Sequence, residues 1–248
     1  MKHQIYLKAA SCFNVGGRTD RDLKRYLKTH YHIDARRLSR LTMLSLAGSL
    51  LLARYQPDEK TPVYVGSKFS SPTLFNAMMD NVFEQQLAKP LDFLSNLHNA
   101  PAFHVAAALG LAGPTVFQTI GKETEAWSKP LLVAANHVGQ NGGSALVGWC
   151  NEAEPPGLEG GSCWLLLCNE QSQHDLPVLE VNKDMVGQNN ANTFQTKTDG
   201  GLEGICSLVR QLNNGNCTVA LPLGGGLSID IRCNTGLTVW NDDLSHVE

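Results

Sequence analysis

Residues 98–122 constrain the fold more than any other segment of the chain. An apolar run that ends at Leu109 predicts a helix over Leu91–Leu109. The turn Gly110–Pro114 ends this helix, because glycine accepts left-handed backbone angles and proline cannot continue a helix. Thr115–Ile120 is rich in β-branched and aromatic residues and predicts a strand. A helix, a tight turn and an apolar strand in direct succession indicate a layered α/β fold.

The rest of the chain alternates strands and helices. Asp34 is the expected N-cap of a helix over Ala35–Arg54. Ser128 and Pro130 favour a helix over the ambiguous run Leu131–Ala135, which would end in the loop at 139–143. Further strands are predicted at Gln4–Phe13, Pro62–Gly66, Ser144–Gly148, Cys163–Cys168, Pro177–Val181, Cys217–Leu221 and Leu227–Cys233, and helices at Thr73–Gln85 and Leu202–Leu212. This alternation predicts an α/β protein built on a layered sheet.

Composition excludes several classes of protein. The net charge of −3 gives no general attraction to nucleic acid. The seven cysteines contain no Cys-x-x-Cys pair and lie mainly in apolar segments, so we expect buried reduced thiols, no metal site and a cytoplasmic protein. Gln4–Ala10 alternates polar and apolar residues and predicts a strand rather than a signal peptide. The longest apolar stretch, Leu41–Ala53, is too short to cross a bilayer, so no membrane span is predicted.

Several segments resemble, in the same order, the β-ketoacyl-acyl-carrier-protein synthases of the thiolase-like superfamily. The helix, Gly-x-x-Gly-Pro turn and strand at 98–120 resemble the unit that leads to the reactive cysteine of that family. Val63–Ser67 resembles its second strand, Leu146–Glu152 lies where the family usually has Ala-Gly-Gly-x-Glu, and Glu159–Leu167 resembles the strand that ends the first half. The resemblance covers residues 60–168. It implies a five-layer α-β-α-β-α fold, with a complete first half in residues 1–170 and a shortened second half in residues 171–248.

The catalytic residues of this family are missing from the positions where the resemblance would put them. Lys122 stands at the nucleophile position, and a lysine cannot hold an acyl chain as a thioester. Gly201 stands where one of the two catalytic histidines would be, and the family's His-Gly-Thr-Gly-Thr motif is absent. The resemblance therefore implies a subunit that has no condensing activity of its own and no cofactor.

Such a subunit resembles a chain length factor, which forms a heterodimer or heterotetramer with an active ketosynthase and meets an acyl carrier protein transiently. In this superfamily the strand before the nucleophile pairs antiparallel with its counterpart in the partner. The resemblance therefore implies an interface formed by Thr115, Val116, Phe117, Gln118, Thr119 and Ile120. It also implies that the preceding helix reaches the partner's acyl tunnel and limits product length through Phe93, Leu94, Leu97 and Phe103. These four side chains could equally fill the chain's own core. The segments Ser71–Phe75 and Leu97–Ala100 resemble ketosynthase-like proteins of aryl polyene clusters.

Two other functions stay open at this point. A malonyl or acyl-carrier-protein decarboxylase or acyltransferase could use Cys150 or Cys206, and a homodimeric acyl-binding module would need no ketosynthase. A basic region within residues 18–40 could attract an acidic acyl carrier protein or form an ordinary solvated helix face. Its members are Arg18, Arg21, Lys24, Arg25, Lys28, Arg36, Arg37 and Arg40.

Overall fold

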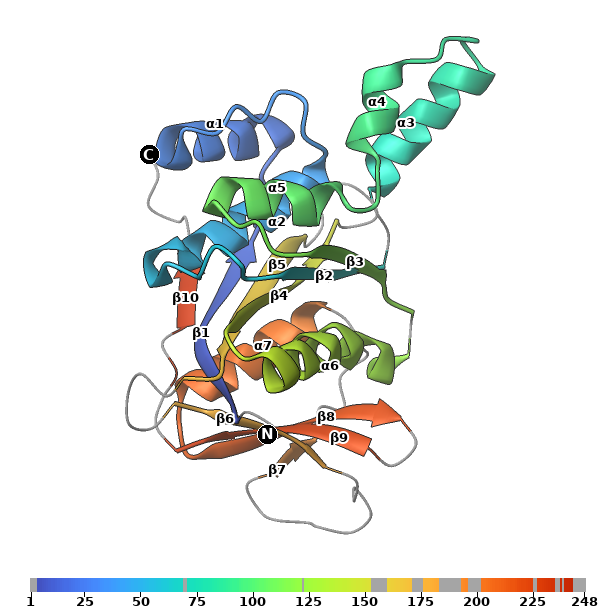
Figure 1. Ribbon diagram of the computed structural model, residues 1–248. Coiled ribbons are helices and arrows are strands. Elements are labelled where there is room, and N and C mark those ends of the chain that lie inside the picture. Colours follow the sequence, from blue (N-terminus) through green and yellow to red (C-terminus); the bar gives the residue numbers. More distant parts are fainter. Residues whose placement is uncertain are drawn as a thin grey trace.

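The computed structural model describes residues 4–68, 71–121, 123–152, 160–170, 176–182, 193–195, 202–224, 227–234, 237 and 239–242. Their strands form one 10-stranded sheet in the order β3-β2-β4-β5-β1-β6-β9-β8-β7, with β10 added beside β1. In space this sheet divides into two layers with helices between them and above them (Figure 1). Among the described residues, none of the helices has the length and apolar character that a bilayer crossing requires.

The first layer contains the N-terminal strands. Its members are β1 (Ile5–Asn14), β2 (Val63–Ser67), β3 (Thr115–Thr119), β4 (Ser144–Asn151), β5 (Gly161–Cys168) and β10 (Val239–Asp242). The strand β2 pairs in parallel with β3 and β4, and β5 pairs antiparallel with β4 and β1. Every residue of β5 is buried, because helices cover both faces of this layer, and such a strand needs a continuous apolar run rather than an alternating one.

The helices lie on both sides of the first layer. The helices α1 (Asp20–Tyr31), α2 (Arg40–Ser49) and α5 (Ala100–Leu109) lie on its outer side, and the 3₁₀ helix η1 (Leu50–Tyr55) continues α2. The helices α6 (Thr124–Asn141) and α7 (Leu202–Asn213) lie between the two sheet layers (Figure 1). Two apolar cores result, one under the outer helices and one around α6 and α7. The remaining helices, α3 (Pro72–Phe83) and α4 (Pro90–Ser95), project from the body as an arm (Figure 1).

Local sequence explains where these helices begin and which side they bury. Thr19 caps α1 and forms a reciprocal capping box with Asp22. Ile205, Leu208 and Leu212 of α7 are buried at helical spacing, so one stripe of this helix faces the inner core. The helix α2 is buried at nearly every position. It is mainly apolar, and the buried hydroxyls of Ser45 and Ser49 donate to backbone carbonyls of the same helix.

Three sequence predictions about the helices were wrong in detail. The single helix expected over Leu91–Leu109 is two helices, because α4 ends at Ser95 and Pro101 fits the first turn of α5. Ser39, not Asp34, caps α2, and its Oγ accepts a hydrogen bond from the backbone N–H of Thr42 at 3.2 Å. The helix α6 continues to Asn141 instead of ending in a loop at residue 139.

The second layer comes from the C-terminal part of the chain. It contains β6 (Val178–Asn182), β7 (Thr193–Gln195), β8 (Cys217–Gly224) and β9 (Leu227–Cys233). It joins the first layer where β6 pairs with the beginning of β1. The expected boundary at residues 170/171 stays a prediction, because residues 171–175 lie outside the described ranges.

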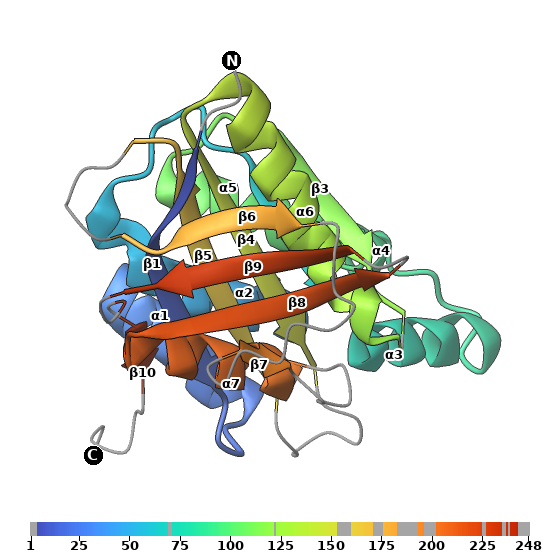
Figure 2. The same cartoon turned by 90° about the horizontal axis from the view of Figure 1, so that it is seen from below.

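The strand β9 turns apolar side chains toward α6 and α7 and charged side chains to the opposite face of the second layer. Ile229 and Ile231 of β9 are buried toward α6 and α7, whereas Asp230 and Arg232 alternate with them. Arg232 forms an ion pair with Glu180 of the neighbouring β6 at 3.2 Å. Among the described residues, no helix covers this face (Figure 2).

Candidate partner-binding surface

The strand β3 lies at one end of the sheet. Among the described strands it pairs only with β2, in parallel. The backbone N–H of Val63 donates to the carbonyl of Pro114, and the N–H of Ile120 donates to the carbonyl of Ser67, both at 2.8 Å. In a parallel ladder alternate residues turn their N–H and C=O groups to the same neighbour. The backbone groups of Thr115, Phe117 and Thr119 therefore point away from β2, toward the open edge.

The side chains of β3 are only partly covered. The residues from Thr115 to Gln118 are half-buried and Thr119 is exposed. Ile120, the last residue of the expected interface, is 3% exposed and packs in the inner core. Ile120 thus supports the chain's own fold, while the five residues of β3 offer backbone groups and side chains at the edge.

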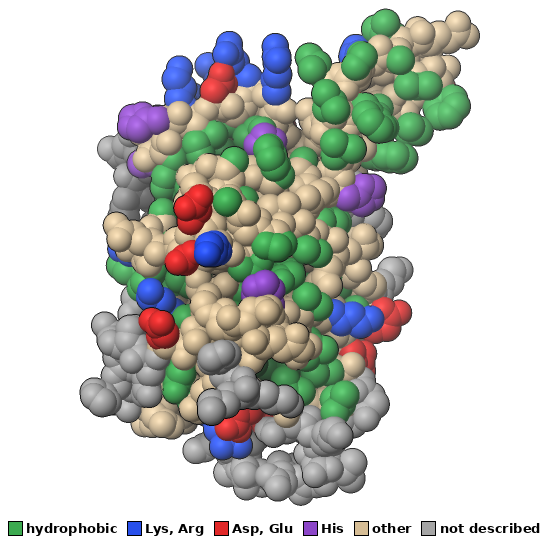
Figure 3. All heavy atoms as spheres, in the orientation of Figure 1, with side chains coloured by type: hydrophobic (Ala, Val, Ile, Leu, Met, Phe, Trp, Pro, Cys, Tyr) green, Lys and Arg blue, Asp and Glu red, His purple; other side chains and the backbone are tan. Residues whose placement is uncertain are grey.

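An apolar surface lies on the arm and α5, close to this edge. It consists of large hydrophobic side chains that are 39% to 73% exposed, namely Phe75, Val82, Phe83, Leu87, Leu91, Phe93, Leu94, Leu97 and Phe103. Neither α3 nor α4 contains a buried residue. In the space-filling view, hydrophobic side chains gather on the projecting arm (Figure 3). Contiguous exposed apolar residues of this size mark interaction sites in proteins.

The four expected tunnel residues belong to this apolar surface. Phe93, Leu94, Leu97 and Phe103 are each about half exposed or more, so the alternative that they fill the chain's own core is wrong. The sequence carries no signal for this exposure, because apolar residues on a short helix suit a core as well as a surface.

Two contacts join the apolar surface to β3. The side-chain amide of Asn99, just before α5, donates to the Thr115 hydroxyl at 2.9 Å. The ring of His98 meets the ring of Phe117 edge-on, with 6.0 Å between centroids. At the base of the arm, the Ser71 hydroxyl donates to the buried Glu152 carboxylate at 2.8 Å. The arm and the edge strand therefore form one continuous surface with fixed attachment points.

The two candidate cysteine nucleophiles, Cys150 and Cys206, are both buried. Lys122 and Gly201 both lie outside the described residues, although α6 begins at Thr124, directly after the expected nucleophile position. Cys150 is fully buried, and burial raises its pKa to about 12. Hydrogen bonding with the side chains of Cys12 and Cys163 lowers the pKa of Cys206. Cys206 is nevertheless 9% exposed and belongs to the inner core.

The basic region is largely a solvated helix face with internal partners at its ends. Arg40 pairs with Asp20, and Arg36 pairs with Asp34. Arg18 donates to the carbonyls of Asn14 and Val15. Arg21, Arg25, Lys28 and Arg37 stay exposed. Lys and Arg side chains line the α1 side of the molecule (Figure 3).

Solved structures share this fold. The ishigamide ketosynthase/chain length factor matches 73% of this chain and 68% of its own chain, with 16% identity and a TM-score of 0.57. A structure of a ketosynthase in complex with its chain length factor from Xenorhabdus doucetiae matches over 93% of this chain and 100% of the other, with 14% identity and a TM-score of 0.59.

A third structure holds a type II polyketide synthase acyl-carrier protein in complex with its ketosynthase bound to the hexaketide. It matches over 95% of this chain and 100% of the other, with 9% identity and a TM-score of 0.60. No protein-family model and no curated protein matches the sequence. The structural likenesses confirm the thiolase-like, ketosynthase-type layered fold that the resemblance implied.

Proposed function

We propose that this chain is a non-catalytic, chain-length-factor-type subunit that forms a heterodimer with an active β-ketoacyl-acyl-carrier-protein synthase and shapes its acyl tunnel. The observation that carries the proposal is the open edge of β3 beside a large exposed apolar surface, within a ketosynthase-type fold. Unpaired strand edges and apolar patches are liabilities in an isolated subunit, and a partner that covers both removes them.

The open edge supports an antiparallel pairing with a partner strand. Thr115, Phe117 and Thr119 direct backbone donors and acceptors outward at alternate positions, as an antiparallel neighbour requires. A pairing across a pseudo-twofold axis would continue the first sheet layer from one subunit into the other.

The apolar surface supports a role in the acyl tunnel. An acyl chain is an apolar ligand, and side chains such as Phe93, Leu97 and Phe103 can close a tunnel without burying a polar group. Because these residues contribute nothing to the chain's own core, their size is free to set how far a growing acyl chain extends. The polyene product class remains part of the proposal and rests on the segments Ser71–Phe75 and Leu97–Ala100 alone.

The buried state of the cysteines supports the absence of condensing activity. Cys150 is sealed from solvent and its pKa is raised by burial, so it is a poor acyl acceptor. This observation disfavours a decarboxylase or acyltransferase that relies on Cys150. The exposed Arg21, Arg25 and Lys28 fit a transient contact with an acidic acyl carrier protein, which would be steered electrostatically to the complex.

Co-expression with candidate ketosynthases of the same organism tests the proposal. We expect a 1:1 complex by size-exclusion chromatography with light scattering. The complex should condense acyl- and malonyl-carrier proteins, and the isolated chain should not. The matched control is the ketosynthase with its reactive cysteine replaced, which should bind this chain and yield no product. A chain that condenses these substrates alone, or that forms a stable homodimer and ignores every ketosynthase, would contradict the proposal.

A further inference from the structure

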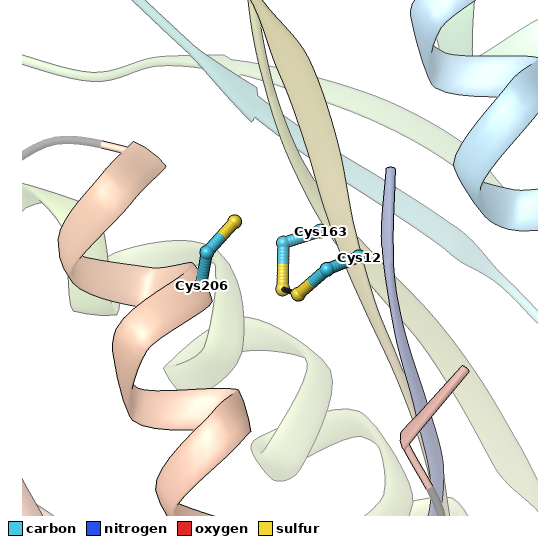
Figure 4. A group of neighbouring side chains, drawn as sticks. All are labelled: Cys12, Cys163 and Cys206. Carbon is cyan, nitrogen blue, oxygen red and sulfur yellow. Dashed lines mark hydrogen bonds between the residues drawn. The ribbon is translucent and has the colours of Figure 1, made fainter. Parts of the chain in front are cut away.

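Three cysteines from distant segments of the chain meet between the two sheet layers (Figure 4). Cys12 lies on β1, Cys163 lies opposite it on β5, and Cys206 reaches them from α7. We propose that these three sulfurs bind a thiophilic d¹⁰ metal ion, either Zn²⁺ or Cu⁺. No sequence pattern points to this site, because the three cysteines lie far apart and outside any Cys-x-x-Cys motif.

The sulfur positions fit a metal-centred triangle. The three Sγ atoms lie within 4.8 Å of one another, and the Sγ atoms of Cys12 and Cys163 are 3.3 Å apart. With a metal–sulfur bond of about 2.3 Å, ligand sulfurs are about 3.8 Å apart in a tetrahedral site and about 4.0 Å apart in a trigonal one. The Cys12–Cys163 separation is somewhat shorter than these values and the other two separations are at most 4.8 Å, so side-chain rotations of a few tenths of an ångström to about one ångström at sulfur bring the three atoms to ligand distance.

The other cysteines behave differently from these three. Each of them donates its thiol to a backbone carbonyl within 3.6 Å, the acceptors being Leu41 for Cys150, Glu170 for Cys168, Gln211 for Cys217 and Leu212 for Cys233. Within the cluster, sulfur faces sulfur instead. Thiols are weak hydrogen-bond donors and acceptors, so a contact between two thiols stabilises the core only slightly. Three sulfurs that converge on one point are better satisfied as the ligands of one shared metal ion.

Burial and charge are compatible with such an ion. Cys163 is 0%, Cys12 5% and Cys206 9% exposed, so the site is shielded from bulk water. Three thiolates and Zn²⁺ carry one net negative charge. Arg210 lies one turn further along α7, and its positive charge favours the thiolate forms of Cys12 and Cys206. Three protein ligands suit trigonal Cu⁺ directly and leave Zn²⁺ one open position. In either case the ion ties α7 to the β1–β5 pair and so joins the two halves of the fold.

The test uses the full chain, reduced and kept anaerobic. Cobalt(II) serves as the spectroscopic probe for the zinc arm, since a thiolate-bound ion gives a sulfur-to-cobalt charge-transfer band in the near ultraviolet. For the copper arm, Cu⁺ is supplied in competition with the chelator bathocuproine disulfonate. We expect one ion per chain in at least one arm. The bound ion should also raise the melting temperature by about 5–10 °C at a hundredfold excess of free metal over Kd.

Matched cysteine variants locate the ion. Cys206→Ser should weaken binding by more than about 100-fold, since even outer-shell changes cost about 10- to 100-fold in affinity. Cys217→Ser, outside the cluster, should bind as the wild type does. The wild-type protein also gives an answer without any variant: in a denaturant concentration that partly unfolds the chain, added metal should slow the alkylation of Cys12, Cys163 and Cys206 relative to the metal-free protein, as read by peptide mass spectrometry. Stoichiometric binding by neither ion, or protection of other cysteines only, would overturn the proposal.

Discussion

A proline at Phe117 should separate folding from partner binding. The N–H of Phe117 points to the open edge of β3, so its loss removes no bond to β2. The strand is an edge strand, where proline is tolerated, and the extended conformation that proline imposes on the preceding Val116 is already that of a strand. Phe117→Pro should therefore fold. Phe117→Ala is the matched control, because it loses the same aromatic ring and keeps the N–H.

The size of the effect follows from the hydrogen bond that the partner would lose. A buried carbonyl left without its donor costs about 1–3 kcal/mol. At 1.4 kcal/mol per factor of ten, Phe117→Pro should bind a partner ketosynthase about 5- to 150-fold more weakly than Phe117→Ala does. In the isolated chain the two variants should have the same melting temperature within the error of the measurement, because the outward N–H has no protein acceptor among the described residues.

Isothermal titration calorimetry with the purified ketosynthase measures the affinity, and thermal denaturation of each free variant measures the fold. Val116→Pro completes the set: its N–H points toward β2, so this variant should lose stability even without a partner. Equal affinities of the folded Phe117→Pro and Phe117→Ala variants would refute the pairing of β3 with a partner strand.

Three further predictions address the apolar surface, the core and the buried thiol. Phe83→Ser should leave the melting temperature of the free chain unchanged, because α3 buries no residue, and should weaken the affinity for the ketosynthase measured by calorimetry. Phe103→Ala in the complex should shift the products to longer acyl chains, as measured by mass spectrometry. Gly148→Ala should destabilise the chain by about 1–3 kcal/mol in urea denaturation, since an added Cβ would clash with the ring of Trp164, and the cost should shrink in a Trp164→Leu background. Burial raises the pKa of Cys150 from 9.0 to about 12, so the unfolded state loses this proton first as the pH rises. The melting temperature should therefore fall between about pH 9 and 12, and Cys150→Ala should make this fall smaller.

The sequence predicted the elements that local rules determine. The strand at β3, the apolar strand β5 and the helix α7 follow from composition and periodicity, and each forms where expected. The order of motifs in the first half added the ketosynthase-type fold, which the structural likenesses confirm. The break before α5 was not predicted, because apolar residues continue on both sides of Pro101 and suggest a single helix. Proline is also common in the first turn of a helix, and Pro101 takes this position in α5.

Properties that depend on tertiary contacts could not be predicted. Nothing in the pattern of the arm told whether Phe93 and Leu94 are core or surface, since an apolar helix satisfies both readings until its neighbours are known. The choice of Ser39 over Asp34 as the cap of α2 likewise depends on where the chain turns. The meeting of Cys12, Cys163 and Cys206 depends on the pairing of β1 with β5 and on the docking of α7 between the sheet layers.

The apolar surface beside β3 differs in character from the outer face of the second sheet layer. On that layer Asp230 alternates with the buried isoleucines of β9, and Arg232 forms an ion pair with Glu180 of β6, so charged side chains lie on the face away from α6 and α7. On the side of β3, by contrast, large apolar side chains such as Phe83 and Phe103 are exposed. Exposed apolar side chains beside a strand edge that no described strand covers are the pattern expected where a second subunit completes the sheet, as the proposed heterodimer requires.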